Sequence, residues 1–295
     1  MPKIVAVVVT YNRKKLLIRC INKLLEQNYP MDILIIDNLS TDGTREALDS
    51  LIQLNKIIYY CTGKNLGGAG GFSEGIKYAY GLGYDYFWIM DDDCMPKSDA
   101  LKELMCINNN FHNQYGFLAS KVLWKNNHIC KMNIQRKTPF RVVNDFHSTK
   151  VRVSMASFVS LLVPRIIVKE VGLPIKEFFI WTDDWEFTRR ISKKYPCFLC
   201  NKSIVIHESS SNIGANIATD SYTRLKRYQF LYRNDVYLYK REGIRGLLYE
   251  FLRLICHITR VLFKAKDYRL SRIKIILIGT FNGIKFAPKI QKFNR

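Results

Sequence analysis

The sequence predicts an α/β fold in which a doubly wound, mostly parallel sheet is followed by a basic helical C-terminal region. Two observations support this prediction. Short runs of β-branched and other apolar residues alternate with segments of helical spacing through residue 110, which is the pattern of a parallel sheet covered by helices on both faces. The basic residues, in contrast, are concentrated in the last quarter of the chain. We therefore expect two regions, residues 1–220 and residues 221–295.

Four apolar runs have the length of strands that are buried on both faces. They occupy residues 4–9, 33–36, 57–60 and 86–90. Apolar residues at three- and four-residue spacing fill the intervals and predict helices around residues 16–25, 47–52 and 72–80. Beyond residue 110 the pattern is less regular, and we expect a further strand at residues 158–163 and a helix at residues 166–171.

Polar, acidic and Gly-rich segments follow the four predicted strands. They are Thr10–Arg13, Asp37–Gly43, Lys64–Gly71 and Asp91–Asp93. In open α/β sheets ligands bind beyond the carboxyl ends of the strands. We therefore expect these segments to gather along one edge of the sheet and to form the binding site there.

The chain of 295 residues is 48% hydrophobic and carries a formal net charge of +21. Such a charge indicates a polyanionic partner, namely nucleic acid, an anionic membrane surface or a phosphate-bearing substrate. Residues 224–295 hold 18 Lys or Arg but only four Asp or Glu, which places +14 of the +21 in this segment. This asymmetry favours a folded domain with a basic tail, because a nucleic-acid wrapper would spread its basic residues over the whole chain.

Three consecutive aspartates, Asp91, Asp92 and Asp93, follow a predicted buried strand. Carboxylates this close repel one another unless a cation neutralises them, and hard oxygen ligands select Mg²⁺ or Mn²⁺. The alternative is the start of a helix, where acidic residues are favoured. Because one acid would suffice for that role, we predict a metal site.

The segment Asn65-Leu-Gly-Gly-Ala-Gly-Gly-Phe72 lies between a predicted strand and a predicted helix. Glycines such as Gly67 and Gly68 let backbone amides approach a diphosphate, and a helix N-terminus adds positive potential. The segment lacks the P-loop pattern, and it does not follow the first strand as a dinucleotide fingerprint would. A flexible turn is the alternative interpretation.

Three carboxylates lie among aromatic residues in the segment Trp181-Thr-Asp183-Asp184-Trp185-Glu186. Desolvation there would raise the pKa of a carboxylate toward that of a useful general base. The alternative is a helix that begins with acids in its first turn. His207 follows the apolar run 203–206; a single histidine at a strand end is commonly structural, but with two carboxylates it makes a suitable Mn²⁺ ligand set.

Taken in order, these motifs resemble those of the inverting family-2 glycosyltransferases of the GT-A fold. The matching segments are Val7–Arg13, Gln27–Pro30, Ile36–Thr44, Asn65–Gly71, Asp91–Asp93, Asp184–Glu186 and His207. The glycine segment, the three aspartates and the tryptophan-led acidic motif are together most similar to the galactofuranosyltransferase branch. Rhamnosyltransferases share much of the pattern.

The resemblance implies a role for each motif. Nucleotide contacts are expected from Thr10, Arg13, Asp37, Asn65, Gly67, Gly68 and Asp92. Metal ligands for Mn²⁺ or Mg²⁺ are expected at Asp91, Asp93 and His207. Asp184 would be the general base, and acceptor contacts are expected from Trp181, Asp183 and Glu186.

The resemblance also implies the substrates of a catalytic domain at residues 1–220. The donor would be UDP-galactofuranose, with dTDP-rhamnose as the alternative, and the acceptor a lipid-linked or polysaccharide glycan. One departure concerns the acceptor, because Gly116–Lys121 stands where the family has a Gly-rich acceptor strand. Nucleic acid is not expected as a partner, since acids at the ligand edge would repel its phosphates.

From about residue 222 the chain reads as basic helices with an apolar stripe. No stretch reaches 18 uncharged apolar residues, so an interfacial amphipathic region is favoured over a membrane span. We expect a cytoplasmic protein, peripheral on the inner face of the cell membrane and bound to its anionic lipids. The alternatives are that the stripe packs on the catalytic domain or forms a homo-oligomer.

Overall fold

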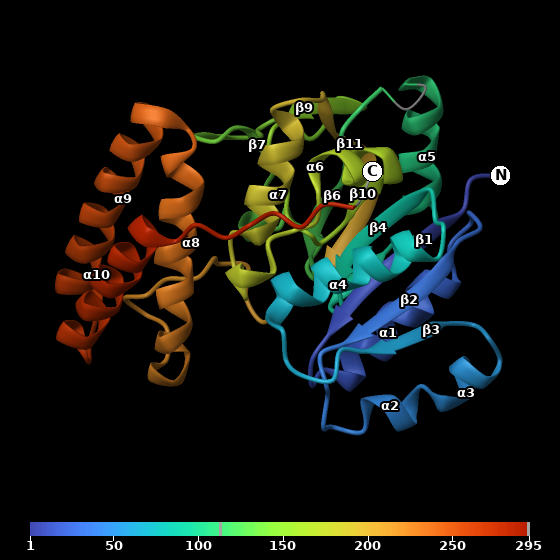
Figure 1. Cartoon of the computed structure of the whole chain (residues 1–295), viewed down its shortest axis with the longest axis horizontal. Coiled ribbons are helices and arrows are strands. Elements are labelled where there is room, and N and C mark those ends of the chain that lie inside the picture. The colour runs from blue at the N-terminus through green and yellow to red at the C-terminus, as the bar shows by residue number, and fades with distance from the viewer. Residues whose placement is uncertain (112–113, 294–295) are drawn as a thin grey trace.

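The computed structural model describes residues 1–111 and 114–293 (Figure 1). Within these ranges a mixed sheet has the strand order β3-β2-β1-β4-β10-β6-β11-β5, and β9 also pairs with β11. Its strands are β1 (Ile4–Thr10), β2 (Asp32–Asp37), β3 (Ile58–Cys61), β4 (Tyr86–Asp91), β5 (Cys94–Pro96), β6 (Leu118–Trp124), β9 (Lys150–Val153), β10 (Leu161–Pro164) and β11 (Cys197–His207). A separate hairpin joins β7 (Arg136–Thr138) to β8 (Arg141–Val142).

The parallel half of the sheet matches the sequence prediction, except that β3 is half-buried rather than buried on both faces, because it lies at the edge of the sheet. β1 pairs in parallel with β2 and with β4, and β2 pairs in parallel with β3. The other half is mixed, because β10 runs antiparallel between β4 and β6. The strand predicted at residues 158–163 begins only at Leu161, since Ser160 turns its hydroxyl into the core to accept a hydrogen bond from Trp88 Nε1.

Helices cover both faces of the sheet, as a doubly wound fold requires. On one face α1 (Lys14–Leu25) and α5 (Ala100–Phe111) contribute to an apolar core that includes Ala6 and Val8. On the other face α4 (Gly67–Gly81), α6 (Arg165–Val171) and α7 (Asp183–Ser192) contribute to a core that includes Val5 and Val7. The helix predicted around residues 47–52 is instead two short ones, α2 (Thr44–Ala47) and α3 (Asp49–Gln53).

The glycine segment is helical in the structure. We predicted a helix from about residue 72, but α4 already begins at Gly67. A Cβ on Gly71 would lie 2.5 Å from Val9, and one on Gly75 would lie 2.7 Å from Val7 and from Ile36. These two glycines therefore let α4 lie close to the sheet, which is a packing reason for the segment that the sequence analysis did not consider.

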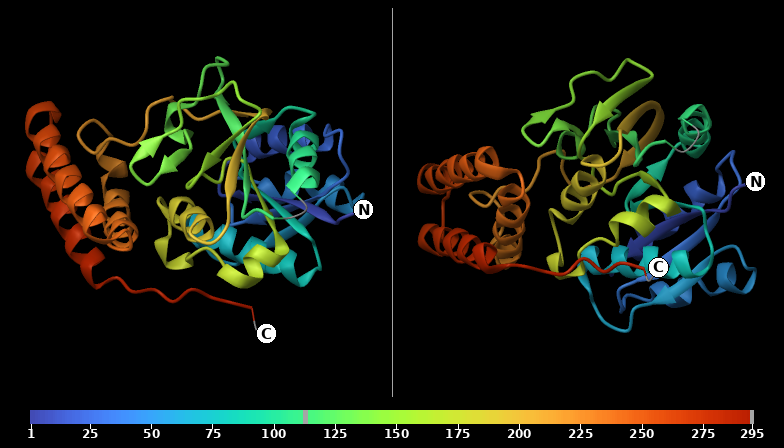
Figure 2. Two further views of the ribbon diagram at one scale, coloured as in Figure 1. Left: turned by 90° about the horizontal axis from the view of Figure 1, so that it is seen from above. Right: turned by 45° about the horizontal axis from the view of Figure 1, so that its top comes forward.

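Three helices form the C-terminal region beside the α/β domain (Figures 1 and 2). They are α8 (Tyr228–Lys240), α9 (Gly243–Lys264) and α10 (Arg269–Lys285). The chain then runs back to the α/β domain, where the amide of Leu173 donates to the carbonyl of Gln291 at 2.9 Å. The ring of Phe293 stacks on Tyr80 with centroids 3.6 Å apart. The helical region is thus connected to the α/β domain both by the chain that leads into α8 and by the segment that follows α10.

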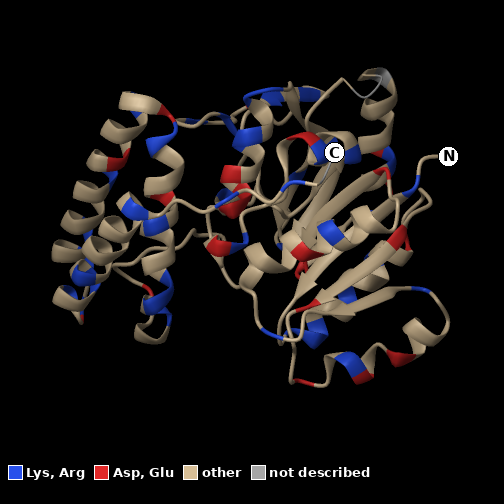
Figure 3. Cartoon of the chain, viewed as in Figure 1, with Lys and Arg blue, Asp and Glu red and all other residues tan. Residues whose placement is uncertain are grey.

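The outer faces of α9 and α10 are apolar and open to solvent. Their exposed side chains include Ile244, Leu247, Leu248, Phe251, Leu252, Ile255, Leu262 and Phe263 on α9, and Leu270, Leu277, Ile278, Phe281 and Ile284 on α10. Figure 3 accordingly draws most of these two helices in tan. Among the residues that the structure describes, no helix is both long enough and apolar enough to cross a membrane.

Candidate active site

The three aspartates lie at the end of β4, at the carboxyl edge of the parallel strands. Strand β5 follows them and α5 starts only at Ala100, so the interpretation of this segment as a helix start does not hold. Thr10 at the end of β1 donates its hydroxyl hydrogen to Asp92 at 2.8 Å. Arg13 Nη1 lies 3.1 Å from an oxygen of Asp92 and 2.7 Å from one of Asp93. The residues predicted to bind ligand at the ends of β1 and β4 therefore lie in contact.

His207 reaches this cluster because β11 pairs with β5, with His207 opposite Cys94 in the register. Its Nε2 lies 3.1 Å from Asp93 Oδ1. Its Nδ1 lies 2.8 Å from Asn133 Oδ1, which can only accept, so Nδ1 is the donor there. Burial would lower the pKa of His207, but the contact with Asp93 outweighs burial and raises the pKa to about 10.

The three aspartates differ in their protonation. Burial, together with the charge of Asp93, raises the pKa of Asp91 to about 8. Burial likewise raises the pKa of Asp92 to about 6, against the effect of Arg13. For Asp93 the effect of burial is outweighed by His207 and Arg13, which lower its pKa to about 2. Among the three, Asp91 is therefore the carboxyl group whose charged form is least favoured without a further cation.

The cluster has features that a divalent cation would satisfy. Asp93 Oδ1 is buried and accepts no hydrogen bond of good geometry from any described residue, although His207 lies near it. Asn133 fixes the His207 ring with Nε2 facing the carboxylates, as outer partners of metal-bound histidines do. In residues 1–111 and 114–293, however, no three His, Cys, Asp or Glu side chains are already arranged as a ligand set. The donor types fit a metal, and the metal role stays a prediction.

The second acidic pair lies at the start of α7. Asp183 is 7% exposed, whereas Asp184 is only partly buried and accepts a hydrogen bond from the amide of Trp185 at 2.7 Å. Burial raises the pKa of Asp183 to about 6. Burial and the charge of Asp183 raise the pKa of Asp184 well above its usual range, and Asp91 adds to this rise. Because the effect of Asp91 on Asp184 acts over a short range, the two acidic motifs lie near each other.

Other predicted residues have structural partners. Both carboxylate oxygens of Asp37 are engaged, by the amide of Ser40 at 2.8 Å and the hydroxyl of Tyr59 at 2.6 Å. Asn65 Oδ1 accepts from the amide of Gly67 at 2.8 Å. The Cα of Gly68 faces open space, because a Cβ there would meet no described atom within 4 Å. Their expected nucleotide contacts stay predictions.

Glu186 is the expected acceptor contact that the geometry favours least. It is 4% exposed, and Arg190 holds its two oxygens at 3.0 and 2.8 Å. Arg190 also donates to the carbonyls of Val171 and Leu173. The pair therefore fastens α7 to the end of α6 and the segment that follows it. Trp181, in contrast, packs against Tyr228 of α8 with ring centroids 5.1 Å apart.

The site depends on residues that the sequence analysis did not select. Asn133 orients His207, and Thr182, which precedes α7, donates to Asp235 of α8 at 2.5 Å. Asn234 of α8 lies beside the same turn and donates to three of its carbonyls. In the sequence, Asn234 and Asp235 could be noticed only as two polar residues between the apolar positions of a basic helix.

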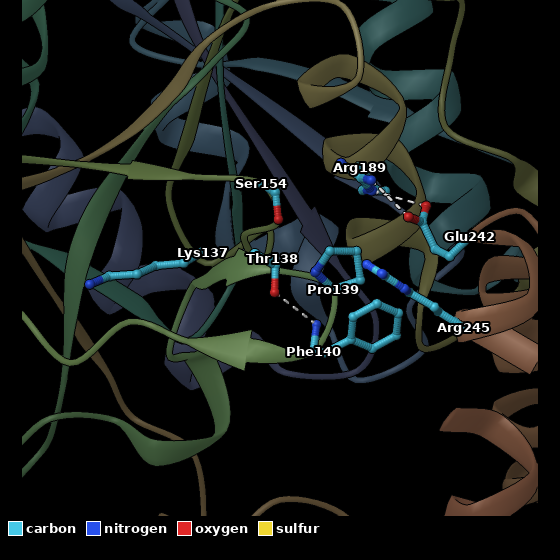
Figure 4. A pocket seen from close by; sticks show the side chains of 8 residues that line it. All are labelled: Lys137, Thr138, Pro139, Phe140, Ser154, Arg189, Glu242 and Arg245. Atoms are coloured by element: carbon cyan, nitrogen blue, oxygen red, sulfur yellow. Dashed lines mark hydrogen bonds and ion pairs between the residues drawn. The ribbon is translucent and has the colours of Figure 1, made fainter. Parts of the chain in front are cut away.

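A basic pocket of about 460 Å³ lies between the β7–β8 hairpin, α7 and the start of α9 (Figure 4). Its lining includes Lys137, Arg189 and Arg245 but only one carboxylate, Glu242. Arg189 and Lys193 bind that carboxylate at 2.7 and 2.8 Å. Arg136, the residue before Lys137, lies with its guanidinium carbon 5.0 Å from the centroid of the Trp185 ring. The pocket thus meets α7 at Arg189, and Arg136 beside it contacts Trp185 near the start of that helix.

An α/β sheet with one acidic cluster after β4 and a second acidic pair at the start of α7 is the arrangement expected from the resemblance to GT-A glycosyltransferases. Three comparisons agree with this class. Residues 5–107 match the family described as Glycosyl transferase family 2. Over this segment, the parallel half of the sheet, the chain is therefore similar to glycosyltransferase family 2.

Curated relatives match over most of their length. Galactofuranosyltransferase GlfT1 of Mycolicibacterium smegmatis is 26% identical over 272 residues, which cover 84% of this chain and 87% of the relative. The dTDP-rhamnosyl transferase RfbF of Shigella flexneri is also 26% identical, over 99% of this chain and 98% of the relative. At this identity both relationships are distant.

Solved structures confirm the predicted fold. S. aureus TarS 1–349 in complex with UDP-GlcNAc superposes with a TM-score of 0.56 at 14% identity, covering 97% of this chain and 73% of that one. GalNAc-T7 with UDP, GalNAc and Mn²⁺ gives a TM-score of 0.58 at 14% identity, covering 78% of this chain and 48% of that one. Both comparisons support a GT-A-like mixed sheet.

Proposed function

We propose that this glycosyltransferase is an inverting, metal-dependent enzyme that transfers galactofuranose from UDP-galactofuranose to a lipid-linked glycan at an anionic membrane surface. The observation that carries the proposal is the convergence of two acidic motifs, one at the end of β4 and one at the start of α7, with Asp91 affecting the protonation of Asp184. One motif faces the leaving diphosphate and the other the attacking hydroxyl.

Asp184 is the general base of the proposed reaction. It is the less buried of the two adjacent aspartates, and its raised pKa suits a group that must take a proton from a sugar hydroxyl. The hydrogen bond from the Trp185 amide holds one carboxylate oxygen and leaves the other for the acceptor. Attack on the anomeric carbon from the face opposite the nucleotide breaks the bond to the diphosphate and inverts that carbon.

Asp91, Asp93 and His207 are the proposed ligands of Mn²⁺ or Mg²⁺. The unsatisfied oxygen of Asp93 and the fixed ring of His207 support this assignment. When bound, the cation would act as a Lewis acid that neutralises the charge of the departing diphosphate. Thr10 and Arg13 orient Asp92 and Asp93 within the cluster through their hydrogen bonds.

The donor proposal rests on the motif resemblance and on the names of the relatives. One relative is a galactofuranosyltransferase and another a dTDP-rhamnosyl transferase, so dTDP-rhamnose is the alternative donor. TarS and GalNAc-T7 have been solved with UDP or a UDP-sugar, which supports a nucleotide-sugar donor here. Residue contacts to the nucleotide are proposed for Thr10, Arg13, Asp37, Asn65, Gly67, Gly68 and Asp92.

The acceptor proposal rests on the order of three features along the molecule. The basic pocket is lined by Arg189 of α7, the helix that begins with Asp183 and Asp184, and by Arg245 in the first turn of α9. The exposed apolar stripe of α9 starts at the neighbouring Ile244. A lipid-linked glycan has its groups in the same order: a sugar hydroxyl that Asp184 would deprotonate, a phosphate that the basic pocket would bind, and a hydrocarbon chain that the apolar stripe would contact. Exposed Arg260, Lys264 and Lys274 add attraction to an anionic leaflet.

The proposal is tested by transfer assays with UDP-galactofuranose and with dTDP-rhamnose, each with a lipid-linked acceptor and with a soluble one. We expect transfer from the first donor, inversion of the anomeric carbon, and loss of turnover in chelator that Mn²⁺ or Mg²⁺ restores. Full activity in chelator would contradict the metal role. Transfer from dTDP-rhamnose alone would replace the donor, and transfer from neither would reject both.

A further inference from the structure

The turn that precedes α7 has an unfavourable backbone. Phe179, Trp181 and Thr182 all have φ values near +65°, which non-glycine residues rarely adopt. Phe179 has φ 65° and ψ −56°, and the amide of Ile180 donates to the carbonyl of Phe178 at 2.7 Å. This geometry is that of the rare, strained γ-turn. Such a conformation persists only where its surroundings hold it.

Helix α8 supplies the groups that hold this turn. Asn234 is fully buried, and its amide nitrogen lies 3.0, 3.1 and 2.9 Å from the carbonyl oxygens of Phe178, Ile180 and Trp181. Two amide hydrogens are thus shared among three acceptors. The next residue, Asp235, accepts the hydroxyl hydrogen of Thr182 at 2.5 Å.

The opposite side of the turn rests on α4. The amide of Ala69 donates to the carbonyl of Phe179 at 3.2 Å. A Cβ on Gly67 would lie 2.1 Å from that same oxygen, so only glycine permits this approach. The turn is therefore clamped between the start of α4 and the middle of α8.

A buried ion-pair chain continues from the turn to α9. Asp235 lies 2.7 Å from Arg253, and Arg253 lies 2.7 Å from Glu250 on the same helix. Asp235 and Glu250 are 7% and 5% exposed. These charges connect the helix with the exposed apolar face to the residue directly before Asp183.

We propose that Asn234, with Asp235, is a positioning residue for catalysis, because it fixes the strained turn that aims the Asp183–Asp184 pair. The inference rests on the proposed role of Asp184. Helix α8 is in this view required for the active site, since the carboxylate that takes the proton keeps its place only while α8 holds the turn. A small displacement of a base from its acceptor is costly to turnover.

The test compares Asn234→Ala and Asn234→Asp with Gly279→Ala in the full chain. Asn234→Asp keeps the shape but cannot donate to the carbonyls. Gly279→Ala is the matched control, because its Cβ would lie 2.8 Å from Tyr232 Cβ and so disturbs the contact of α10 with α8 without touching the turn. Turnover, donor affinity and hydrogen exchange of residues 178–186 are measured for each variant.

We expect both Asn234 variants to lower kcat by about tenfold or more, with donor affinity unchanged and faster exchange confined to residues 178–186. Gly279→Ala should lower the melting temperature while kcat changes little. The double variant Phe179→Gly/Asn234→Ala should recover part of the lost kcat, because glycine adopts the left-handed turn without support.

Two results would overturn the inference. One is parent-like kcat and exchange in Asn234→Ala, and the other is an equal loss of kcat in Gly279→Ala at the same loss of melting temperature. A wrong assignment of the base gives a different signature, namely an Asp184→Asn variant that keeps its activity while Asn234→Ala still accelerates exchange in the turn.

Discussion

The α/β domain and the C-terminal helices differ in what they leave exposed. In the sheet, Val7, Ile35 and Trp88 are fully buried. The helices also bury apolar side chains such as Tyr232 and Val261, but Leu247, Phe251 and Ile255 are 50%, 60% and 46% exposed. Both regions have an apolar core, and the second in addition presents an apolar patch of the kind that marks an interaction surface. The predictions below test this contrast.

The largest expected effect concerns the chemistry of the α/β domain. Asp184→Asn retains the shape of the side chain but cannot accept a proton, so kcat should fall by about 10²-fold or more with donor affinity retained. Steady-state kinetics with either donor measure this. If Asp183→Asn is the more damaging of the two variants, the roles of the two aspartates are reversed.

The second prediction compares one residue type in the two regions. Ile35 is 0% exposed and Ile255 is 46% exposed. Ile35→Ala should lower the free energy of unfolding by about 2–5 kcal/mol because it leaves a cavity. Ile255→Ala should change it by no more than about 0.5 kcal/mol in water. Denaturant unfolding without lipid decides this, and a large cost at Ile255 would mean that its face is covered in solution, for example by a second copy.

The third prediction tests what covers the apolar face. Leu248→Glu and Phe251→Glu together should reduce flotation with anionic vesicles by about tenfold, because they place charges where apolar side chains would be buried. Leu54→Glu is the matched control, since Leu54 is 67% exposed but lies in the α/β domain. Equal flotation of the two proteins, or no preference for anionic over neutral lipid, would exclude membrane binding by this face.

The smallest expected effect is a pH dependence within the helices. Burial raises the pKa of Glu250 to about 7, against the effect of Arg253. Because this value lies above that of the unfolded chain, about 4.3, the contribution to stability is complete at low pH and is lost as the pH rises through 7. From pH 5 to pH 8 the melting temperature should fall by a few degrees more in the parent than in Glu250→Gln. Identical pH profiles of the two proteins would rule out this titration.

The parallel half of the sheet was predictable because each of its strands is a continuous apolar run. Strands β5, β6 and β9 were not, since β5 has three residues and β9 alternates buried Val151 with exposed Lys150 and Arg152 at the sheet's margin. A short or alternating strand leaves little signal in the sequence.

Some residues of the candidate site could likewise be predicted from the sequence, and others could not. Asp91 to Asp93, Asp184 and His207 were selected because their residue types and order match a motif. Asn133 and Asn234 were not, because each matters only through a partner that is 74 or about 55 residues away in the chain. Such partners are brought together by the fold, and the two polar residues among the apolar positions of α8 are the one local pattern that marks any of them.

The return of the chain end to the α/β domain has a geometric consequence. The three helices are joined to that domain through residues 208–227 at one end, and through the contacts of Gln291 and Phe293 at the other. With the contacts of α8 to the turn before α7 and the ion pair between Arg189 and Glu242, these attachments restrict rotation of the helices relative to the sheet. Where α9 and α10 lie on a bilayer, the acidic residues at the carboxyl edge of the sheet should therefore lie at a fixed distance from the bilayer surface. The enzyme would then select acceptors by length, favouring those whose reactive hydroxyl lies at that distance from the lipid.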